Sequence, residues 1–345
     1  MCLEIRHPLT GHAELGLRRK RVIVPPHSKR ADGYNKGMIL PSKEFRQTER
    51  RNPASKNLDR MSSLEMIRLM NREDRKVADA VGREIPAIAR AVDEIVKRLR
   101  SGGRMIYVGA GSSGRLAILD AAECPPTFGV SRKKVQALIA GGQRAITHAV
   151  EGAEDSVKNA VRDLQRAKLS KKDVVVGVAA SATTPYVLGA IRYAKKIGAM
   201  TIGVAANRAG QLRKLANIFI APEAGPEVLT GSTRLKAGTA QKMVLNMLST
   251  AAMVQLGHAY ENLMIDAVLT NKKLEGRAVR ILQEACGASA SSAEHALRAS
   301  GHSMRLGLVM LKWGVNVSEA KKLLRKANGN LQLALRETAK PRENG

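Results

Sequence analysis

Residues 103–129 read GRMIYVGAGSSGRLAILDAAECPPTFG, and this stretch decides the fold. The apolar run 105–108 has the length and composition of a buried strand, residues 109–114 form a glycine-rich loop, and residues 115–122 have the apolar spacing of a helix. A strand, a glycine loop and a helix in this order point backbone N–H groups and the positive helix end at an anion. The candidate binding residues in this stretch are Gly111, Ser112, Ser113, Gly114 and Arg115.

The glycine pattern G-x-G-x-x-G also occurs in dinucleotide sites, so the motif alone has low specificity. Ser112 and Ser113 carry hydroxyls that can bind a phosphate, whereas a dinucleotide fingerprint relies on backbone alone. No second strand ending in an acidic residue follows about 20 residues on, as a dinucleotide site would require. A glycine turn that binds no ligand is the third interpretation.

Further strand-like runs at 135–140, 173–179, 200–204 and 217–221 alternate with helical patterns. This order predicts an α/β fold with a doubly wound parallel sheet flanked by helices, with ligands bound beyond the carboxyl ends of the strands. The run at 173–179 leads into a second hydroxyl-rich loop, in which Ser181, Thr183 and Thr184 precede Pro185 at a helix start. Simple N-capping explains one of these hydroxyls, and two such loops together suit a sugar phosphate.

The net charge of +28 over 345 residues suggests either a nucleic-acid partner or a generally basic surface. Residues 1–51 contribute only +7, so the charge is spread along the chain, and the basic residues lack interleaved aromatics. We therefore expect no nucleic-acid partner. No apolar run approaches 18 residues, which predicts no membrane span. The three cysteines indicate a reducing, cytoplasmic location, and the histidines show no metal spacing.

Three regions are expected. Residues 1–46 form a basic, irregular extension interrupted by proline and glycine. Residues 47–275 form the sheet domain with a helical lead-in, in which Ser62 and Glu65 have capping-box spacing and Pro86 suits a first helical turn. Residues 276–345 suggest a small module of three helices, and a long helix is expected over 239–256 before Gly257.

Several segments of the chain resemble the N-acetylmuramic acid 6-phosphate etherases, a family of sugar-isomerase-type (SIS) domain proteins. The segments are RNPAS at 51–55, GAGSSGRLAILDAAECPPTFGV at 109–130, AEDS at 153–156, GVAASATTPYVLGAI at 177–191, TGSTRLKAGTAQKMVLNMLSTAAM at 230–253 and NLMIDAVLTNKKL at 262–274. The resemblance runs from about residue 48 to the C-terminus, and the module after 275 looks like a ubiquitin-associated bundle. Ala182-Thr183 departs from the Gly-Arg common in the family and places a methyl group in a tight loop.

The resemblance implies a cofactor-free carbon–oxygen lyase of cell-wall recycling. It would cleave the D-lactyl ether of N-acetylmuramate 6-phosphate into N-acetylglucosamine 6-phosphate and D-lactate, in a homodimer with sites at the interface. The family's proton donor corresponds to Glu123, expected in the last helical turn before Pro125 and Pro126. Its second glutamate corresponds to Glu154, expected on a helix over 149–164, and the division of acid and base roles stays open.

Ser232 and Lys236 join the candidate substrate-binding residues, since they lie in the segment 230–236 before the long helix. Two functions of other classes are alternatives. One is a non-enzymatic sugar-phosphate sensor, against which both glutamates argue. The other is a DNA-binding regulator, for which residues 1–46 are too interrupted to form an N-terminal helix-turn-helix.

Overall fold

The computed structural model describes residues 47–327 and 329–336. The expected basic extension, residues 1–46, lies outside the described residues. None of the helices within the described ranges is long and apolar enough to cross a membrane.

The predicted doubly wound sheet is confirmed. Five parallel strands lie in the order β2-β1-β3-β4-β5. Their bounds are β1 Met105–Gly109, β2 Val135–Ile139, β3 Val174–Val178, β4 Met200–Val204 and β5 Ile218–Ile220. Gly109 pairs in register with Ile139 on one side and Val178 on the other, so three neighbouring strands end at the same edge.

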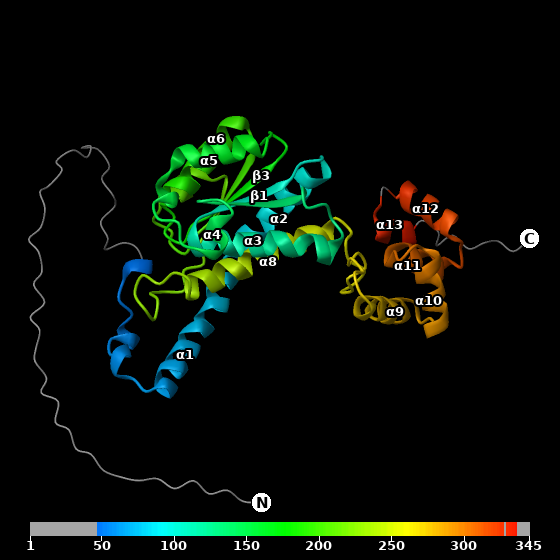
Figure 1. The fold of residues 1–345 in the computed structure, drawn as a ribbon, viewed down its shortest axis with the longest axis horizontal. Helices are drawn as coiled ribbons and strands as arrows, with labels where there is room; N and C mark the ends of the chain where they lie inside the picture. Colours follow the sequence, from blue (N-terminus) through cyan, green and yellow to red (C-terminus); the bar gives the residue numbers. More distant parts are fainter. Residues whose placement is uncertain (1–46, 328, 337–345) are drawn as a thin grey trace, which may run out of the picture. The chain divides into compact units, whose positions relative to one another are not determined.

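Helices cover both faces of the sheet (Figure 1). Alternate side chains of β1 point to opposite faces, so Met105 and Tyr107 enter one apolar core and Ile106 and Val108 the other. The first core is completed by α1 (Ser63–Gly82), α2 (Ile85–Arg100), α3 (Gly111–Phe128) and α8 (Lys236–Gln255), and the second by α5 (Val157–Arg166), α6 (Pro185–Ile197) and α7 (Gln211–Leu215).

Helix α3 departs from the expectation at both ends. It begins at Gly111, within the predicted loop, and it continues past Pro125 and Pro126 to Phe128. The prediction that the prolines end the helix is therefore wrong. Each proline removes one backbone donor, but the last turn is closed by Gly129, whose N–H donates to the Pro125 carbonyl at 2.9 Å in a left-handed conformation (φ 62°).

The lead-in helices are as predicted. Ser62 and Glu65 form a capping box at the start of α1, and Pro86 lies in the first turn of α2. The long helix α8 begins three residues before the expected start at 239.

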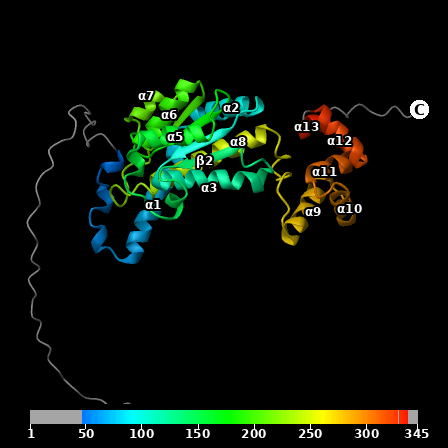
Figure 2. The same cartoon turned by 45° about the horizontal axis from the view of Figure 1, so that its top comes forward.

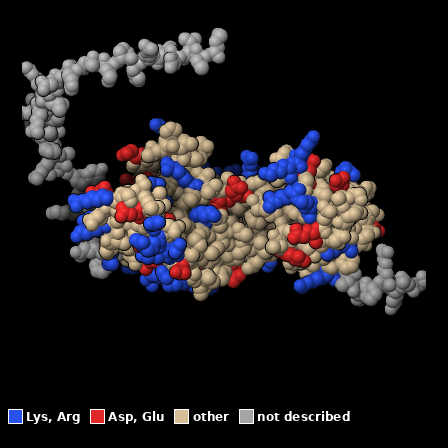
Figure 3. Space-filling model, turned by 90° about the horizontal axis from the view of Figure 1, so that it is seen from below, with Lys and Arg blue, Asp and Glu red and all other residues tan. Residues whose placement is uncertain are grey.

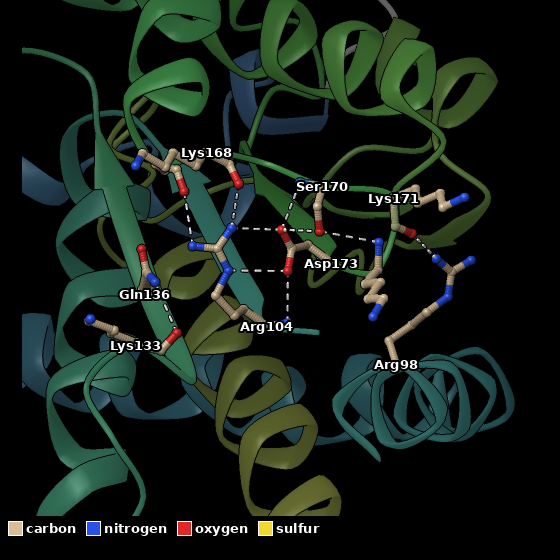
Figure 4. Close-up of polar contacts among 10 residues, drawn as sticks. Arg98, Arg104, Lys133, Gln136, Lys168, Ser170, Lys171 and Asp173 are labelled. Carbon is tan, nitrogen blue, oxygen red and sulfur yellow. Dashed lines mark hydrogen bonds and ion pairs between the residues drawn. The ribbon is translucent and has the colours of Figure 1, made fainter. Parts of the chain in front are cut away.

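At the amino ends of the strands, Arg104 joins β1 to β3 (Figure 4). Its Nε and Nη2 donate to the two carboxylate oxygens of Asp173 at 3.2 and 2.8 Å, and Ser170 N donates to the same carboxylate at 2.9 Å. Burial raises the pKa of Asp173, but these hydrogen bonds and the arginine charge outweigh it and lower the pKa below its usual value. This network holds the amino ends of β1 and β3 together, at the end of the sheet opposite to the candidate site.

The C-terminal module contains five helices among its described residues, not three, and they form a bundle of their own (Figure 2). They are α9 (Lys272–Cys286), α10 (Ala290–Ala299), α11 (Met304–Trp313), α12 (Val317–Lys326) and α13 (Leu331–Arg336). Gly287 and Gly314 end two of them in left-handed conformations. Breaks near 301–302 and 315–317 were expected from the sequence, and the break at Gly287 was not. The expected boundary at 275/276 falls within α9, and Ile265 already belongs to the apolar core of the bundle.

Candidate active site

A cleft of about 380 Å³ lies beyond the carboxyl ends of β1 and β2, and we call it the β1–β2 cleft. Its lining residues are Ala110, Gly111, Ser112, Arg115, Ala140, Ala145 and 148–154. It therefore combines the start of α3 with the whole loop that leads to Glu154. Sequence reasoning placed Gly111, Ser112, Arg115 and Glu154 in one site, and the structure brings these four together.

The start of α3 is suited to bind an anion. Ala110 is the N-cap residue and provides no side-chain acceptor for the first N–H groups of the helix. A phosphate at this position would accept from those N–H groups and meet the positive end of the helix dipole. The hydroxyl of half-buried Ser112 lines the same space.

Arg115 connects α3 to the loop after β2. Its Nε donates to the Ala145 carbonyl at 3.1 Å and its Nη2 to the His148 carbonyl at 3.2 Å. Arg115 thus anchors the loop that carries Glu154 while its side chain lines the cleft.

Glu154 lies on a single 3-10 turn, η5 (Ala153–Asp155), and not on a helix over 149–164 as expected. Gly152 adopts a left-handed conformation (φ 68°) before this turn, and Ser156 caps a separate helix, α5, by accepting from Asn159 N at 3.2 Å. These two local features separate the turn from the helix. Glu154 is consequently an exposed side chain at the cleft.

Ser113 points away from the β1–β2 cleft. It is only 8% exposed and its Oγ donates to Gln241 Oε1 of α8 at 2.9 Å. The other end of this amide, Gln241 Nε2, is buried without a partner in the described chain. Gln241 was missed from sequence, because a glutamine in an apolar helix gave no signal of contact with the start of α3, 128 residues earlier.

The second hydroxyl loop is bonded mainly within itself. Ser181 Oγ accepts from Thr183 N at 3.2 Å and from Thr183 Oγ1 at 3.1 Å, and it lies 3.5 Å from Thr184 Oγ1. None of the three residues lines the β1–β2 cleft. Ala182 is fully buried with a φ of 59°, so the methyl group does enter a tight loop in a conformation that favours glycine.

Lys236 is buried, at 1% exposure. Its Nζ donates to Glu73 Oε2 at 2.7 Å and to the Ala224 carbonyl at 3.0 Å. Its charge is thus matched inside the protein, and neither Lys236 nor Ser232, whose N–H closes a turn onto the Leu229 carbonyl, lines the β1–β2 cleft.

Glu123 lies in a different cleft, of about 1010 Å³, which we call the Glu123 cleft. It is lined by Ile118, Ala121–Glu123, Pro125–Thr127, Arg132, Val135–Ala137, Met264, Ala267, Val268, Thr270, Leu274 and Arg277. Glu123 is 11 residues beyond Ser112 on the same helix, or about 16–17 Å along the axis. One chain therefore does not bring Glu123 and Glu154 together.

Residues 87–195 match the family model described as the glucokinase regulatory protein N-terminal SIS domain. The N-acetylmuramic acid 6-phosphate etherase of Clostridium botulinum (strain Loch Maree / Type A3) is 51% identical over 290 residues, covering 84% of this chain and 96% of the relative. The protein of the same name from Yersinia pestis (strain Pestoides F) is 52% identical over 288 residues, covering 84% and 98%. The chain belongs to the N-acetylmuramic acid 6-phosphate etherase family.

Membership of the etherase family confirms the resemblance that the sequence motifs carried. Among solved structures, a phosphoheptose isomerase from Francisella tularensis overlaps with 56% of this chain and 100% of its own, at 19% identity and a TM-score of 0.44. An overlap at this score adds nothing to the assignment.

The etherase-family motifs did not identify every residue of the cleft. His148 and Glu151 line it and were not predicted. Their position offered a signal, since they follow β2, the neighbour of β1, and precede Glu154.

In the part of the chain that the structure describes, no group of three or more His, Cys, Asp or Glu side chains could hold a metal ion.

Proposed function

We propose that this chain is a carbon–oxygen lyase that cleaves the D-lactyl ether of N-acetylmuramate 6-phosphate, releasing D-lactate and N-acetylglucosamine 6-phosphate. Identity above 50% to proteins named for this etherase activity supports the proposal. The observation that carries it is the β1–β2 cleft, where the uncapped start of α3 and the carboxylate of Glu154 face one space.

In the proposed reaction, the sugar binds in its open-chain form with its phosphate at the start of α3. A base removes the proton at C2, the C3–oxygen bond breaks, and the leaving lactate oxygen takes up a proton. Water then adds at C3 and a proton returns to C2. We assign Glu154 as the base at C2 and Glu123 as the donor to the leaving oxygen, because an elimination with a poor leaving group needs both partners.

The proposal includes a homodimer in which Glu123 of one copy completes the site of the other. Gly114 and Glu123 are nine residues apart on α3, about 13–14 Å at 1.5 Å per residue, whereas C2 and C3 lie only a few ångströms from the phosphate of the same sugar. Exposed apolar side chains on the helices of one layer support a partner surface, since Ile67 of α1 is 63%, Leu119 of α3 51% and Met247 of α8 36% exposed.

The net charge has no concentrated site on the surface that Figure 3 shows, where Lys and Arg are scattered with Asp and Glu among them. We therefore retain a small anionic substrate, and no nucleic acid, as the proposed partner. The proposed location is cytoplasmic, supported by Cys124 and Cys286, which are both free.

The test is incubation of the full chain with N-acetylmuramate 6-phosphate and measurement of D-lactate. We expect release without added metal or nucleotide and no effect of EDTA. Glu154→Gln should lower kcat by at least about 100-fold, as expected for loss of a general base. Asp155→Asn, on the same turn but outside the cleft lining, is the matched control. Tight binding of the sugar phosphate without lactate release would instead favour a non-enzymatic regulator.

A further inference from the structure

The Glu123 cleft contains more positive than negative charge. Among the described residues that line it, the charged side chains are Glu123, Arg132 of the loop before β2, and Arg277 of α9. The two arginines come from segments 145 residues apart, and the backbone holds their elements together. Val268 N, in the segment before α9, donates to the Pro126 carbonyl of α3 at 3.1 Å.

Both arginines lack a carboxylate partner within the described residues. Arg277 Nη2 donates to Met264 Sδ at 3.9 Å, and Arg132 forms no ion pair in the same part of the chain. Several arginines of the described residues do bind a carboxylate: Arg104 binds Asp173, Arg208 binds Glu84, Arg298 binds Glu294 and Arg305 binds Asp266. The polar neighbour Gln136 is also engaged, since its Nε2 donates to the Lys133 carbonyl at 2.9 Å (Figure 4).

The remaining walls of the cleft are mainly apolar, with Thr127, Gln136 and Thr270 as the other polar side chains. Ile118 and Ala121 of α3 contribute one side and Met264, Ala267 and Val268 contribute the other. A mainly apolar cleft with two guanidinium groups suits the carboxylate and methyl group of a small organic acid.

The substrate of the proposed function carries such a group. In N-acetylmuramate 6-phosphate the lactyl carboxylate and methyl group are attached to the carbon that bears the ether oxygen. An acid that protonates this oxygen must therefore lie next to the carboxylate as well. Resting on the proposed function, we propose that Arg277, with Arg132 in the same cleft, binds the lactyl carboxylate of the molecule whose ether oxygen Glu123 protonates.

The arginines also act on the reaction through charge. A guanidinium beside the lactyl carboxylate holds the leaving group as negative charge develops on the ether oxygen, and it stabilises the Glu123 carboxylate that forms as the proton is transferred. The lactyl group is thereby recognised by a different cleft surface from the one that binds the phosphate.

Equilibrium binding tests this inference without depending on turnover. Calorimetry on Glu123→Gln protein would compare N-acetylmuramate 6-phosphate with the analogue in which the lactyl carboxylate is a carboxamide. Adding Arg277→Ala should weaken binding of the carboxylate ligand by about 10–100-fold, as for a lost charge-assisted hydrogen bond, and of the carboxamide by less than about threefold. Arg277→Lys should recover part of the loss, because it restores charge but not the bidentate fork.

The matched control is Arg280→Ala, an exposed arginine of the same helix that does not line the cleft; it should leave both affinities unchanged. If Arg277→Ala weakens binding of the two ligands equally, Arg277 has a structural role. If it weakens neither, the side chain is solvated and does not contact the ligand. Either result overturns the inference. Failure of the wild type to release D-lactate, despite the expected binding pattern, would overturn the proposed function alone.

Discussion

A buried lysine needs a partner, and Lys236 has one in Glu73, which is itself only 3% exposed. Asn52 Nδ2 and Lys76 Nζ also donate to the Glu73 carboxylate, at 2.9 and 2.5 Å. Burial raises the pKa of Glu73, but the hydrogen bonds from Lys236, Lys76 and Asn52 and the charge of Lys236 outweigh it and lower the pKa to about 2. The pair ties α1 to the start of α8.

Breaking this pair should destabilise the protein. Glu73→Gln should lower the free energy of unfolding by about 3–5 kcal/mol, because it leaves the buried Lys236 ammonium without its carboxylate. Lys236→Met should cost less than Glu73→Gln, because Lys76 and Asn52 still donate to the Glu73 carboxylate. The double variant Glu73→Leu/Lys236→Met should lose much less unfolding free energy than the two single variants together. Urea denaturation at pH 7 measures all three, and Lys76→Met, which removes a mostly exposed partner, should cost less than about 1 kcal/mol. A Lys236→Met protein of normal stability with weaker substrate binding would restore the substrate-contact role expected from sequence.

The same pair gives the stability a defined pH dependence. A carboxyl group with a lowered folded-state pKa stabilises the fold above its unfolded value and loses that contribution as pH falls through its folded value. The advantage of the wild type over Glu73→Gln should thus be complete near neutral pH and disappear between pH 4.5 and about 2. Urea denaturation at several pH values across this range would measure the difference in unfolding free energy between the wild type and Glu73→Gln. A difference that stays constant down to pH 2 would contradict the lowered pKa of Glu73.

The junction of β1 and α3 depends on close backbone approach. A Cβ at Gly109 would lie 2.8 Å from both the N and Cα atoms of Gly114, and a Cβ at Gly114 would lie 2.5 Å from Ile139 Cγ1. These glycines let the first turn of α3 rest directly on the sheet, and so they set where its N–H groups point.

Gly109→Ala should therefore move the start of α3 and cost about 1–3 kcal/mol by overpacking, with a parallel loss of affinity for sugar phosphate. Thermal denaturation and calorimetric titration would measure the two effects. Gly238→Ala is the control, since its Cβ meets nothing closer than 3.4 Å and alanine favours a helix interior by about 0.8–1 kcal/mol. Unchanged affinity in Gly109→Ala would mean that the phosphate does not use this turn.

Sequence predicted those elements whose cause is local. The strands are short apolar runs, and glycine or hydroxyl residues follow β1 and β3, so the sheet and the start of the cleft could be recognised. The predicted end of α3 was wrong. The two prolines remove backbone hydrogen-bond donors, but they do not prevent a final helical turn, which Gly129 closes.

Contacts between distant segments could not be predicted from the sequence. Lys236 was expected to bind substrate, and this stays a prediction. Its contact with Glu73, 163 residues earlier, could not be foreseen because no local pattern links the two residues. Arg277 attracted no notice, because only the packing of the segment before α9 onto α3 places it in the cleft of Glu123.

At the scale of the whole molecule, the two glutamates occupy separate clefts of one chain. If the proposed dimer pairs them across a two-fold axis, Glu123→Gln and Glu154→Gln should be nearly inactive as homodimers. In a randomly mixed population about half of the dimers are hybrids with one intact site each, so about a quarter of wild-type activity should return. D-lactate release by the refolded mixture is the measurement.

Differently tagged subunits, copurified on both tags, would prove that hybrids formed. A hybrid as inactive as its parents would place both glutamates in the site of a single subunit. In the control, both differently tagged subunits carry Glu154→Gln, and this mixture should remain inactive.

Because α3 carries both the anion-binding turn and Glu123, the two are spaced by a count of residues on a rigid rod. Adding or removing one residue between them would turn one end against the other by about 100° and shift it by about 1.5 Å. A substitution on the exposed face of α3 leaves this spacing unchanged, whereas an insertion or deletion between residues 112 and 123 should abolish activity. The loop at 287–289 lies outside this helix, so a residue inserted there would leave the spacing unchanged.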